Sequence, residues 1–300
     1  MKKLMLGNEA AARGLYEAGC ALISSYPGTP STEITERAAQ YDEIYCEWAP
    51  NEKVAMEVAF GAALAGKRSA CVMKHVGLNV AADPLFTIAY TGVNAGMVIC
   101  VADDPGMHSS QNEQDSRHYA VSAKIPMLEP ADSAEARDFA KRAFELSEEY
   151  DTPVFLKLCT RISHSQSIVE LGQRVEPARR PYEKDIAKYV MVPGNARPRH
   201  PIVEERTRRL TAFAETTDLN REEMGEDTSI GIITSSTSYQ YAHEVFGPKA
   251  SILKLGLVNP LPKQKILDFA AKVDKVLVLE ELDPVIEDHC RALGLDVLGK

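Results

Sequence analysis

The sequence predicts an α/β protein in which a parallel-sheet domain is followed by a second, smaller α/β domain. Short apolar runs alternate with helical patterns from residue 8 to about residue 165, which is typical of a parallel sheet with crossover helices. The same alternation resumes near residue 228, after a stretch rich in Arg, Glu, Lys and Pro. We therefore expect a first α/β domain over 1–165, a connecting arm over 166–227 and a second α/β domain over 228–300.

The first domain is expected to contain helices and strands in alternation. Its strands are short apolar runs at 21–26, 44–46, 69–73, 96–102 and 154–158. Its helices show apolar residues at helical spacing or follow capping residues, and they cover 8–18, 31–40, 52–66, a segment from Asn79 to about 92, and 134–149. Asn8 is expected to cap the first helix, and Ser31 or Thr32 the second, because a short polar side chain accepts a hydrogen bond from a free backbone amide.

The connecting arm and the second domain offer fewer regular elements. The arm has one strand-like run, 189–192, and a helical pattern over 203–215. The second domain has strands at 229–235, 251–255 and 275–279, with helices at 238–246 and 263–272. These elements are too few for a large free-standing domain, and the chain ends directly after a further helix and strand. We therefore expect the chain to be a fragment of a longer protein.

The composition argues against several classes of protein. A net charge of -9 and a pI near 5.4 disfavour a general nucleic-acid-binding protein. No apolar run is long enough to span a membrane, and the first residues lack the apolar stretch of a signal peptide. The six cysteines are scattered without the spacing of a metal site. We therefore predict no metal site in this chain and a reducing, cytoplasmic location.

Glu52 is the first candidate functional residue. It opens a helix whose other face is small and apolar, formed by Val54, Ala55, Val58, Ala59, Ala62 and Ala65. A carboxylate held against such a face is poorly hydrated and needs a partner. Alternatively, Glu52 only favours the positive end of the helix dipole.

Two loops that follow predicted strands carry further candidates, since ligands of open α/β sheets gather at the carboxyl ends of the strands. In the first loop Gly28 permits a tight turn and Thr29 presents a hydroxyl group, although a simple Pro/Gly turn explains both residues as well. In the second, His75 precedes Gly77 and Asn79. This loop suits an anion or an aromatic ligand, or else a histidine with a structural role.

A third loop, 103–117, is densely polar directly after an apolar strand. It is a candidate ligand rim or subunit contact, and His108 lies within it. A metal site formed by Asp103, Asp104 and His108 is conceivable, but their spacing is not diagnostic. The motifs GxSxG, GxxxxGK[ST] and GxGxxG do not occur after the predicted strands, which disfavours hydrolase, NTPase and nicotinamide chemistry.

Taken in order, four of these segments resemble motifs of the 2-oxoacid:ferredoxin oxidoreductases. They are residues 26–31, 51–55, 74–79 and 103–115, and in the second domain residues 254–262 and 278–284 agree. Within this family the chain is most similar to the alpha subunits of the indolepyruvate ferredoxin oxidoreductases, over nearly its whole length. The resemblance implies a pyrimidine-type domain of thiamine diphosphate enzymes, followed by a domain like the C-terminal domain of transketolase.

The resemblance also implies roles for the candidate residues. Glu52 would be the catalytic carboxylate that hydrogen-bonds N1′ of the aminopyrimidine and promotes its imino tautomer, in a site from which water is excluded. The cofactor would be bound by Glu52 together with Gly28, Gly77 and Asn79. The substrate would lie beside Thr29, His75 and His108.

The sequence departs from the family pattern in two respects. Pyruvate-using relatives carry an arginine after the third strand for the substrate carboxylate, whereas residues 102–105 here read Ala-Asp-Asp-Pro. This leaves the carboxylate unassigned, with Lys74, His75 and His108 as hypothetical substitutes, and it fits bulkier aryl pyruvates. The chain also lacks a GDG motif for the diphosphate and cysteine motifs for clusters. We therefore expect Mg²⁺ and [4Fe-4S] clusters to be bound elsewhere in the parent protein.

The complete enzyme would oxidatively decarboxylate an aryl pyruvate such as indolepyruvate, reduce ferredoxin and form an acyl-CoA. Its expected partners are a beta subunit, ferredoxin and coenzyme A in an oligomer, with no nucleic acid and no membrane. One alternative is a non-catalytic assembly module that contributes one wall of a cofactor site to a partner chain. Another is a different 2-oxoacid oxidoreductase or a transketolase-like enzyme.

Overall fold

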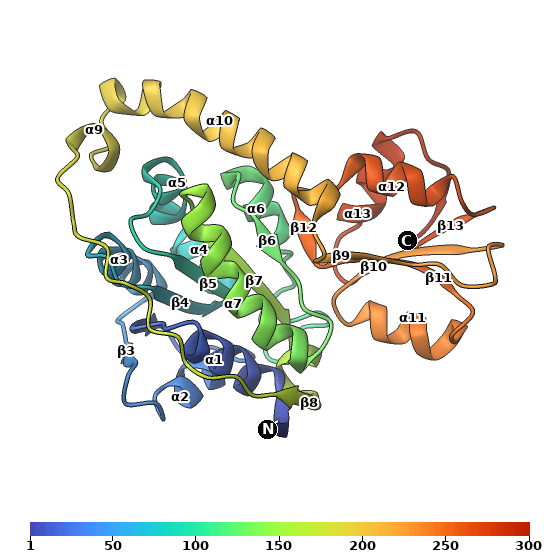
Figure 1. The fold of residues 1–300 in the computed structure, drawn as a ribbon, viewed down its shortest axis with the longest axis horizontal. Helices are drawn as coiled ribbons and strands as arrows, with labels where there is room; N and C mark the ends of the chain where they lie inside the picture. The colour runs from blue at the N-terminus through green and yellow to red at the C-terminus, as the bar shows by residue number, and fades with distance from the viewer.

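The computed structural model describes residues 1–300 and contains two main sheets, each flanked by helices (Figure 1). A seven-stranded sheet has the order β12-β6-β7-β5-β4-β2-β3, and all of its neighbouring pairs are parallel except β12 with β6. Its strands are β2 (Leu22–Ser25), β3 (Tyr45–Trp48), β4 (Ser69–Lys74), β5 (Met97–Asp103), β6 (Met127–Leu128), β7 (Val154–Cys159) and β12 (Leu257–Asn259).

Helices cover both faces of this sheet, as its wholly buried central strands β4, β5 and β7 require. One face packs against α1 (Gly7–Glu17), α2 (Thr32–Ala38) and α7 (Ser133–Tyr150). The other packs against α3 (Glu52–Leu64), α4 (His75–Val80), α5 (Ala82–Thr91) and α6 (Arg117–Ala123). In β4, Ala70 and Val72 belong to the first apolar cluster, whereas Cys71 and Met73 belong to the second. This alternation is the period of two that a strand buried on both faces must have.

The second sheet has five strands in the order β14-β13-β10-β11-β9, with β9 antiparallel at its edge. Its strands are β9 (Asn220–Glu223), β10 (Gly231–Ser235), β11 (Ser251–Leu255), β13 (Val276–Leu279) and β14 (Val297–Leu298), and its helices are α11 (Ser238–Phe246), α12 (Lys263–Ala270) and α13 (Val285–Ala292). The apolar cluster beneath α3 and α5 continues into this part, through Ile233 and Leu253. The α/β class and the parallel character of the sheets are therefore confirmed.

The three-part division at 165 and 228 stays a prediction. β9 comes from the expected arm yet joins the second sheet, and β12 comes from the expected second domain yet joins the first sheet. The arm itself folds into α9 (Ile186–Tyr189) and the long helix α10 (Pro193–Thr216), which Figure 1 shows running from α9 to the second sheet. The strand-like interpretation of 189–192 is wrong: Tyr189 ends α9, which Asp185 starts by accepting a hydrogen bond from the Lys188 amide, and residues 190–192 link α9 to α10 without a strand.

Other local predictions also require correction. The helix expected from Asn79 begins at His75, directly at the end of β4. Ser31 is at the N-cap of α2, but its hydroxyl donates to the carbonyl of Gly28 and makes no capping bond. Two short strands, β1 (Lys2–Leu6) at the start of the first domain and β8 (Gln166–Glu170) at the start of the expected arm, pair antiparallel and were not expected, because their pattern is largely exposed. The short helix α8 (Thr160–His164) also follows β7.

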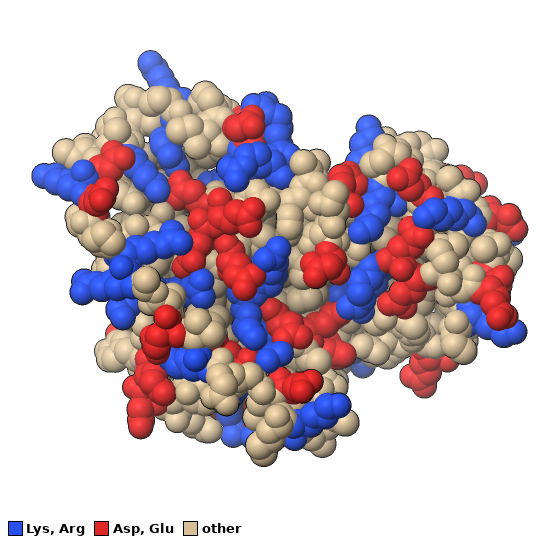
Figure 2. Space-filling model, viewed as in Figure 1, with Lys and Arg blue, Asp and Glu red and all other residues tan.

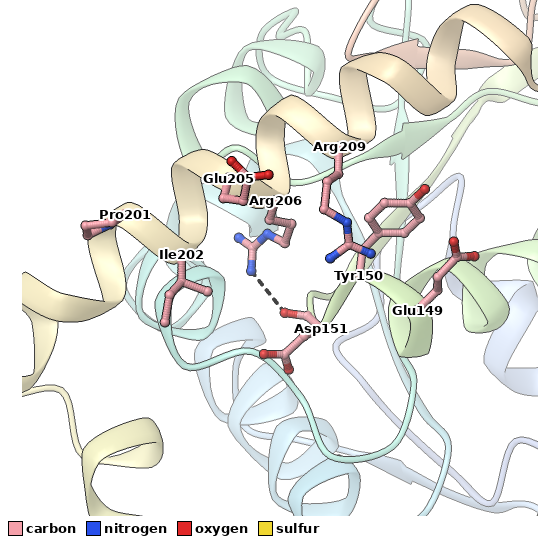
Figure 3. A pocket seen from close by; sticks show the side chains of 8 residues that line it. All are labelled: Glu149, Tyr150, Asp151, Pro201, Ile202, Glu205, Arg206 and Arg209. Carbon is pink, nitrogen blue, oxygen red and sulfur yellow. Dashed lines mark hydrogen bonds between the residues drawn. The ribbon is translucent and has the colours of Figure 1, made fainter.

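Asp151 anchors the arm to the first domain. Its carboxylate contacts Lys188 at 2.9 Å and Arg199 at 3.4 Å, and its backbone carbonyl accepts a hydrogen bond from Arg206 at 3.0 Å. Figure 3 shows Arg206 and Arg209 of α10 reaching toward the end of α7 around a pocket of about 410 Å³. Three acidic residues line the same pocket, so its charge is mixed.

None of the helices combines the length and the apolar character that crossing a bilayer requires. Acidic and basic side chains are interspersed over the face shown in Figure 2. All six cysteines are free.

Candidate functional site

Glu52 lies in the first turn of α3, which follows β3 at the carboxyl edge of the first sheet. The helix starts there because Asn51 accepts a hydrogen bond from the Val54 amide at 3.0 Å. Glu52 is 8% exposed and lies on the same side of α3 as Ala55 and Ala59, which are fully buried. The burial of α3 was predicted only in part, because Met56 and Ala63 are buried in line with them whereas Ala65 is exposed.

The Glu52 side chain packs directly on Gly77 of the neighbouring helix α4. A Cβ atom at Gly77 would lie 2.5 Å from Cγ and 2.7 Å from Cδ of Glu52, closer than real atoms approach. The carboxylate forms no hydrogen bond and no ion pair with any group of this chain. Glu52 and Gly77 are therefore far apart in the sequence but in contact in the structure. The Glu52 carboxylate has no hydrogen-bond partner within the chain.

His75 lies at the start of α4 and is 1% exposed. Its Nε2 is 3.2 Å from the carbonyl oxygen of Asn112. A carbonyl oxygen can only accept, so Nε2 carries the proton, and in the neutral ring Nδ1 is an acceptor. Nδ1 is buried and has no partner within the chain.

Lys74 ends β4, one residue before His75, and it too is buried. Its Nζ donates to the carbonyl oxygen of Ser109 at 3.1 Å. Its aliphatic stem lies against Gly28, where a Cβ atom would be 2.8 Å from Cδ of the lysine. Gly28 therefore allows the lysine stem to pass close to the backbone of the first loop.

The polar loop after β5 closes over this edge of the sheet because Asp104 holds it. The carboxylate of Asp104 accepts hydrogen bonds from the Ser109 amide at 2.8 Å, the Ser110 hydroxyl at 2.7 Å and the Thr160 hydroxyl at 2.7 Å. Burial acts to raise the pKa of Asp104, but these hydrogen bonds outweigh it and lower the pKa to about 2. The Ser109 hydroxyl then donates to the Thr29 carbonyl at 3.3 Å, which joins the loop to the first one.

The remaining candidates are less enclosed. The side chains of Thr29 and His108 belong to exposed residues, and the His108 ring makes no hydrogen bond within the chain. Asn79 is exposed as well, and its Oδ1 accepts a hydrogen bond from the Tyr119 hydroxyl at 2.6 Å. The structure thus brings Glu52 and Gly77 into contact, whereas His108 and Asn79 lie at the surface.

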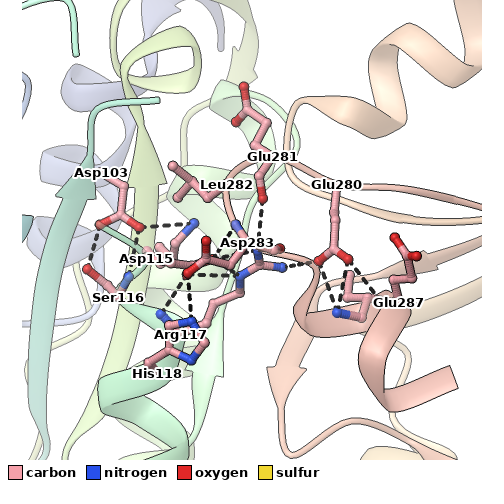
Figure 4. A network of polar contacts seen from close by, with 12 residues as sticks. Asp103, Asp115, Ser116, Arg117, His118, Glu280, Glu281, Leu282, Asp283 and Glu287 are labelled. Atoms are coloured by element: carbon pink, nitrogen blue, oxygen red, sulfur yellow. Dashed lines mark hydrogen bonds and ion pairs between the residues drawn. The ribbon is translucent and has the colours of Figure 1, made fainter. Parts of the chain in front are cut away.

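Behind the loop, a buried ionic network connects it to the second sheet, and the sequence alone did not indicate it (Figure 4). Arg117, 1% exposed, contacts Asp115 at 2.6 Å and Glu280 at 2.5 Å, and it also donates to the backbone carbonyls of Glu281 and Asp283. Burial alone would lower the pKa of Arg117, but the surrounding carboxylates raise it above its usual range. The arginine is therefore a permanent cation between the two sheets.

Comparisons with known proteins agree with this arrangement. Residues 13–229 match a family model described as "Pyruvate flavodoxin/ferredoxin oxidoreductase, thiamine diP-bdg". The indolepyruvate oxidoreductase subunit IorA of Archaeoglobus fulgidus is 44% identical over 100% of this chain and 50% of its own length. The protein of the same name from Methanothermobacter thermautotrophicus is also 44% identical, over 100% of this chain and 51% of its own length. The chain thus spans about half the length of these curated relatives.

Two solved structures show the same fold. A 2-oxoglutarate:ferredoxin oxidoreductase from Magnetococcus marinus superposes with a TM-score of 0.82 at 18% identity, over 100% of this chain and 62% of the other. A split-gene transketolase superposes with a TM-score of 0.57 at 15% identity, over 98% of this chain and 86% of the other. These likenesses confirm a pyrimidine-type domain followed by one like the C-terminal domain of transketolase.

Proposed function

Because this chain belongs to the thiamine-diphosphate-binding family of the pyruvate flavodoxin/ferredoxin oxidoreductases, we propose that it forms the pyrimidine side of a thiamine diphosphate site in a 2-oxoacid oxidoreductase. The names of its relatives support indolepyruvate, or another aryl pyruvate, as the substrate. They also support a further subunit as a partner, since each relative is named as one subunit of an enzyme. Ferredoxin as electron acceptor and an acyl-CoA as product complete the proposal.

The observation that carries this proposal is the carboxylate of Glu52 beside Gly77, on a side chain that is 8% exposed. Its oxygens pair with no group of the chain and are not sealed from solvent, so a ligand can reach them with a hydrogen-bond donor. The residues present fit the pyrimidine half of thiamine diphosphate, whose ring nitrogen N1′ can share a proton with a carboxylate. Gly77 fits this role because its missing side chain lets the Glu52 side chain lie directly against the backbone of α4.

Bound thiamine diphosphate supplies the carbon nucleophile and the electron sink that decarboxylation of a 2-oxoacid needs. The chain's own task is narrower. Glu52 holds a proton at N1′, and its low exposure keeps water from competing for that hydrogen bond. His75 Nδ1 offers an acceptor at the end of β4, and Thr29 and His108 are proposed to line the open substrate side.

The test is Glu52→Gln in the assembled enzyme, with exchange of the cofactor C2 proton followed by NMR. The amide keeps the shape of Glu52 but cannot take a proton, so exchange should slow by roughly 10²- to 10⁴-fold. Glu57→Gln is the matched control, because Glu57 is an exposed residue of the same helix. Unchanged exchange in a folded Glu52→Gln enzyme would remove Glu52 from the mechanism and favour a non-catalytic assembly module.

A further inference from the structure

Lys74 differs from the other buried lysines of the chain in the partner of its charge. Three lysines are buried: Lys74, Lys157 and Lys254. Lys157 contacts Glu129 at 2.6 Å and Asp103 at 3.5 Å, and Lys254 contacts Glu135 at 2.5 Å. Each of these two therefore has a carboxylate at contact distance. Lys74 forms no ion pair, and its single hydrogen bond goes to the neutral carbonyl of Ser109.

A buried ammonium group without a counter-charge is unfavourable, because a carbonyl replaces only part of its lost hydration. The group donates three hydrogen bonds, and Ser109 accepts one of them. Two donors therefore remain for a ligand. The lysine is also held in place, since its stem packs on Gly28 and its Nζ bonds to a loop that Asp104 fixes. These features describe a prepared site for an anion at the carboxyl end of β4.

The anion has to suit the neighbouring groups. His75 presents an unprotonated Nδ1 in its neutral form, so it cannot donate to a carboxylate from that atom. His108 is exposed on the outside of the loop. Glu52 contacts Gly77, which lies in α4 three residues after Lys74. His75 is also buried without a carboxylate partner, but its proton is held by the Asn112 carbonyl, whereas Lys74 keeps two donors free.

We propose that Lys74 binds the carboxylate of the 2-oxoacid substrate. This inference rests on the proposed function. Residues 102–105 contain no arginine that could bind the substrate carboxylate, and the proposal gives that role to Lys74. The ammonium group donates to the substrate carboxylate, and the aryl part extends toward the open side of the loop near Thr29. Lysine is a compact cation on a flexible stem, so it grips one carboxylate oxygen without the planar match of a guanidinium group.

The test uses the assembled enzyme with phenylpyruvate as substrate. Lys74→Met keeps the stem and removes the charge, so the KM for phenylpyruvate should rise by roughly 10- to 100-fold, with a smaller change in kcat. Lys74→Arg should recover part of the loss. Lys67→Met is the matched control, because Lys67 is exposed in the same domain and should leave KM unchanged.

A second measurement separates a lost carboxylate contact from a misfolded site. Phenylpyruvate and its neutral amide are compared as ligands by their dissociation constants. The wild-type enzyme should prefer the carboxylate, and Lys74→Met should erase that preference. An unchanged preference overturns the proposal. The proposal is also overturned if Lys74→Met weakens only the binding of thiamine diphosphate, because the lysine would then contact the diphosphate group of the cofactor. A wild-type enzyme whose cofactor exchanges no C2 proton contradicts the proposed function itself, whatever Lys74 binds.

Discussion

At the scale of single residues, the contact between Glu52 and Gly77 is the most constrained feature of the candidate site. A Cβ atom at Gly77 would collide with Oε1 of Glu52 and lie 2.5 Å from its Cγ and 2.7 Å from its Cδ, so the whole Glu52 side chain would have to move. The glycine thus places the carboxylate, although it cannot take part in chemistry itself. The sequence suggested a ligand-binding glycine, and the structure adds which side chain it accommodates.

Gly77→Ala is therefore expected to displace Glu52 and to destabilise the fold by about 1–3 kcal/mol, which is typical of overpacking. C2-proton exchange in the assembled enzyme should slow as well, because the carboxylate leaves its position. Gly61→Ala is the control: nothing lies within 4 Å of a Cβ atom there, and alanine at this exposed position stabilises helix α3 by up to about 1 kcal/mol. Urea denaturation and NMR exchange measure the two effects. Equal behaviour of both variants would mean that Gly77 imposes no constraint.

At the scale of helices and strands, the long buried strands were predicted with nearly correct bounds, whereas short or polar elements were predicted in part or not at all. β4 and β5 are buried on both faces, so their sequences are apolar without interruption and their bounds were nearly correct. α6 was not predicted because its first residue, Arg117, ends the polar loop and is buried only through two carboxylates, Asp115 two residues earlier and Glu280 at the end of β13. Lys74 shows the same limit, since its lack of a counter-charge depends on which carboxylates fold near it.

The helix α10 illustrates how a mostly polar element is held by ion pairs in its first half and by a few buried apolar residues in its second half. Asp151→Asn removes the charge that binds Lys188 and Arg199, while asparagine still tolerates the left-handed backbone of this residue, whose φ is 52°. We expect faster hydrogen exchange across residues 186–206 and a loss of about 1–3 kcal/mol in stability. Glu149→Gln, which alters an exposed acidic residue of the same pocket, should change neither. Identical exchange in the two variants would show that the ion pairs at Asp151 do not hold the arm.

At the scale of the whole molecule, the two sheets are joined by both a strand and a charge network. β12 adds to the first sheet, and Arg117 connects Asp115 in the loop to Glu280 at the end of β13. The same loop supplies the carbonyl of Asn112 that fixes the His75 ring. The position of the second sheet is therefore coupled to the geometry of the candidate site through buried groups.

Arg117→Met tests this coupling, because it leaves two buried carboxylates facing each other without their cation. Stability in urea should fall by about 3–5 kcal/mol, and hydrogen exchange should increase together in the loop 103–117 and in residues 280–284. Arg161→Met is the control, since Arg161 is 57% exposed and lies 3.8 Å from Glu281 across the same boundary. A pair so open to water contributes under about 1 kcal/mol. If both variants lost the same stability, or if exchange rose in the loop alone, the buried arginine would not be what couples the second sheet to the site.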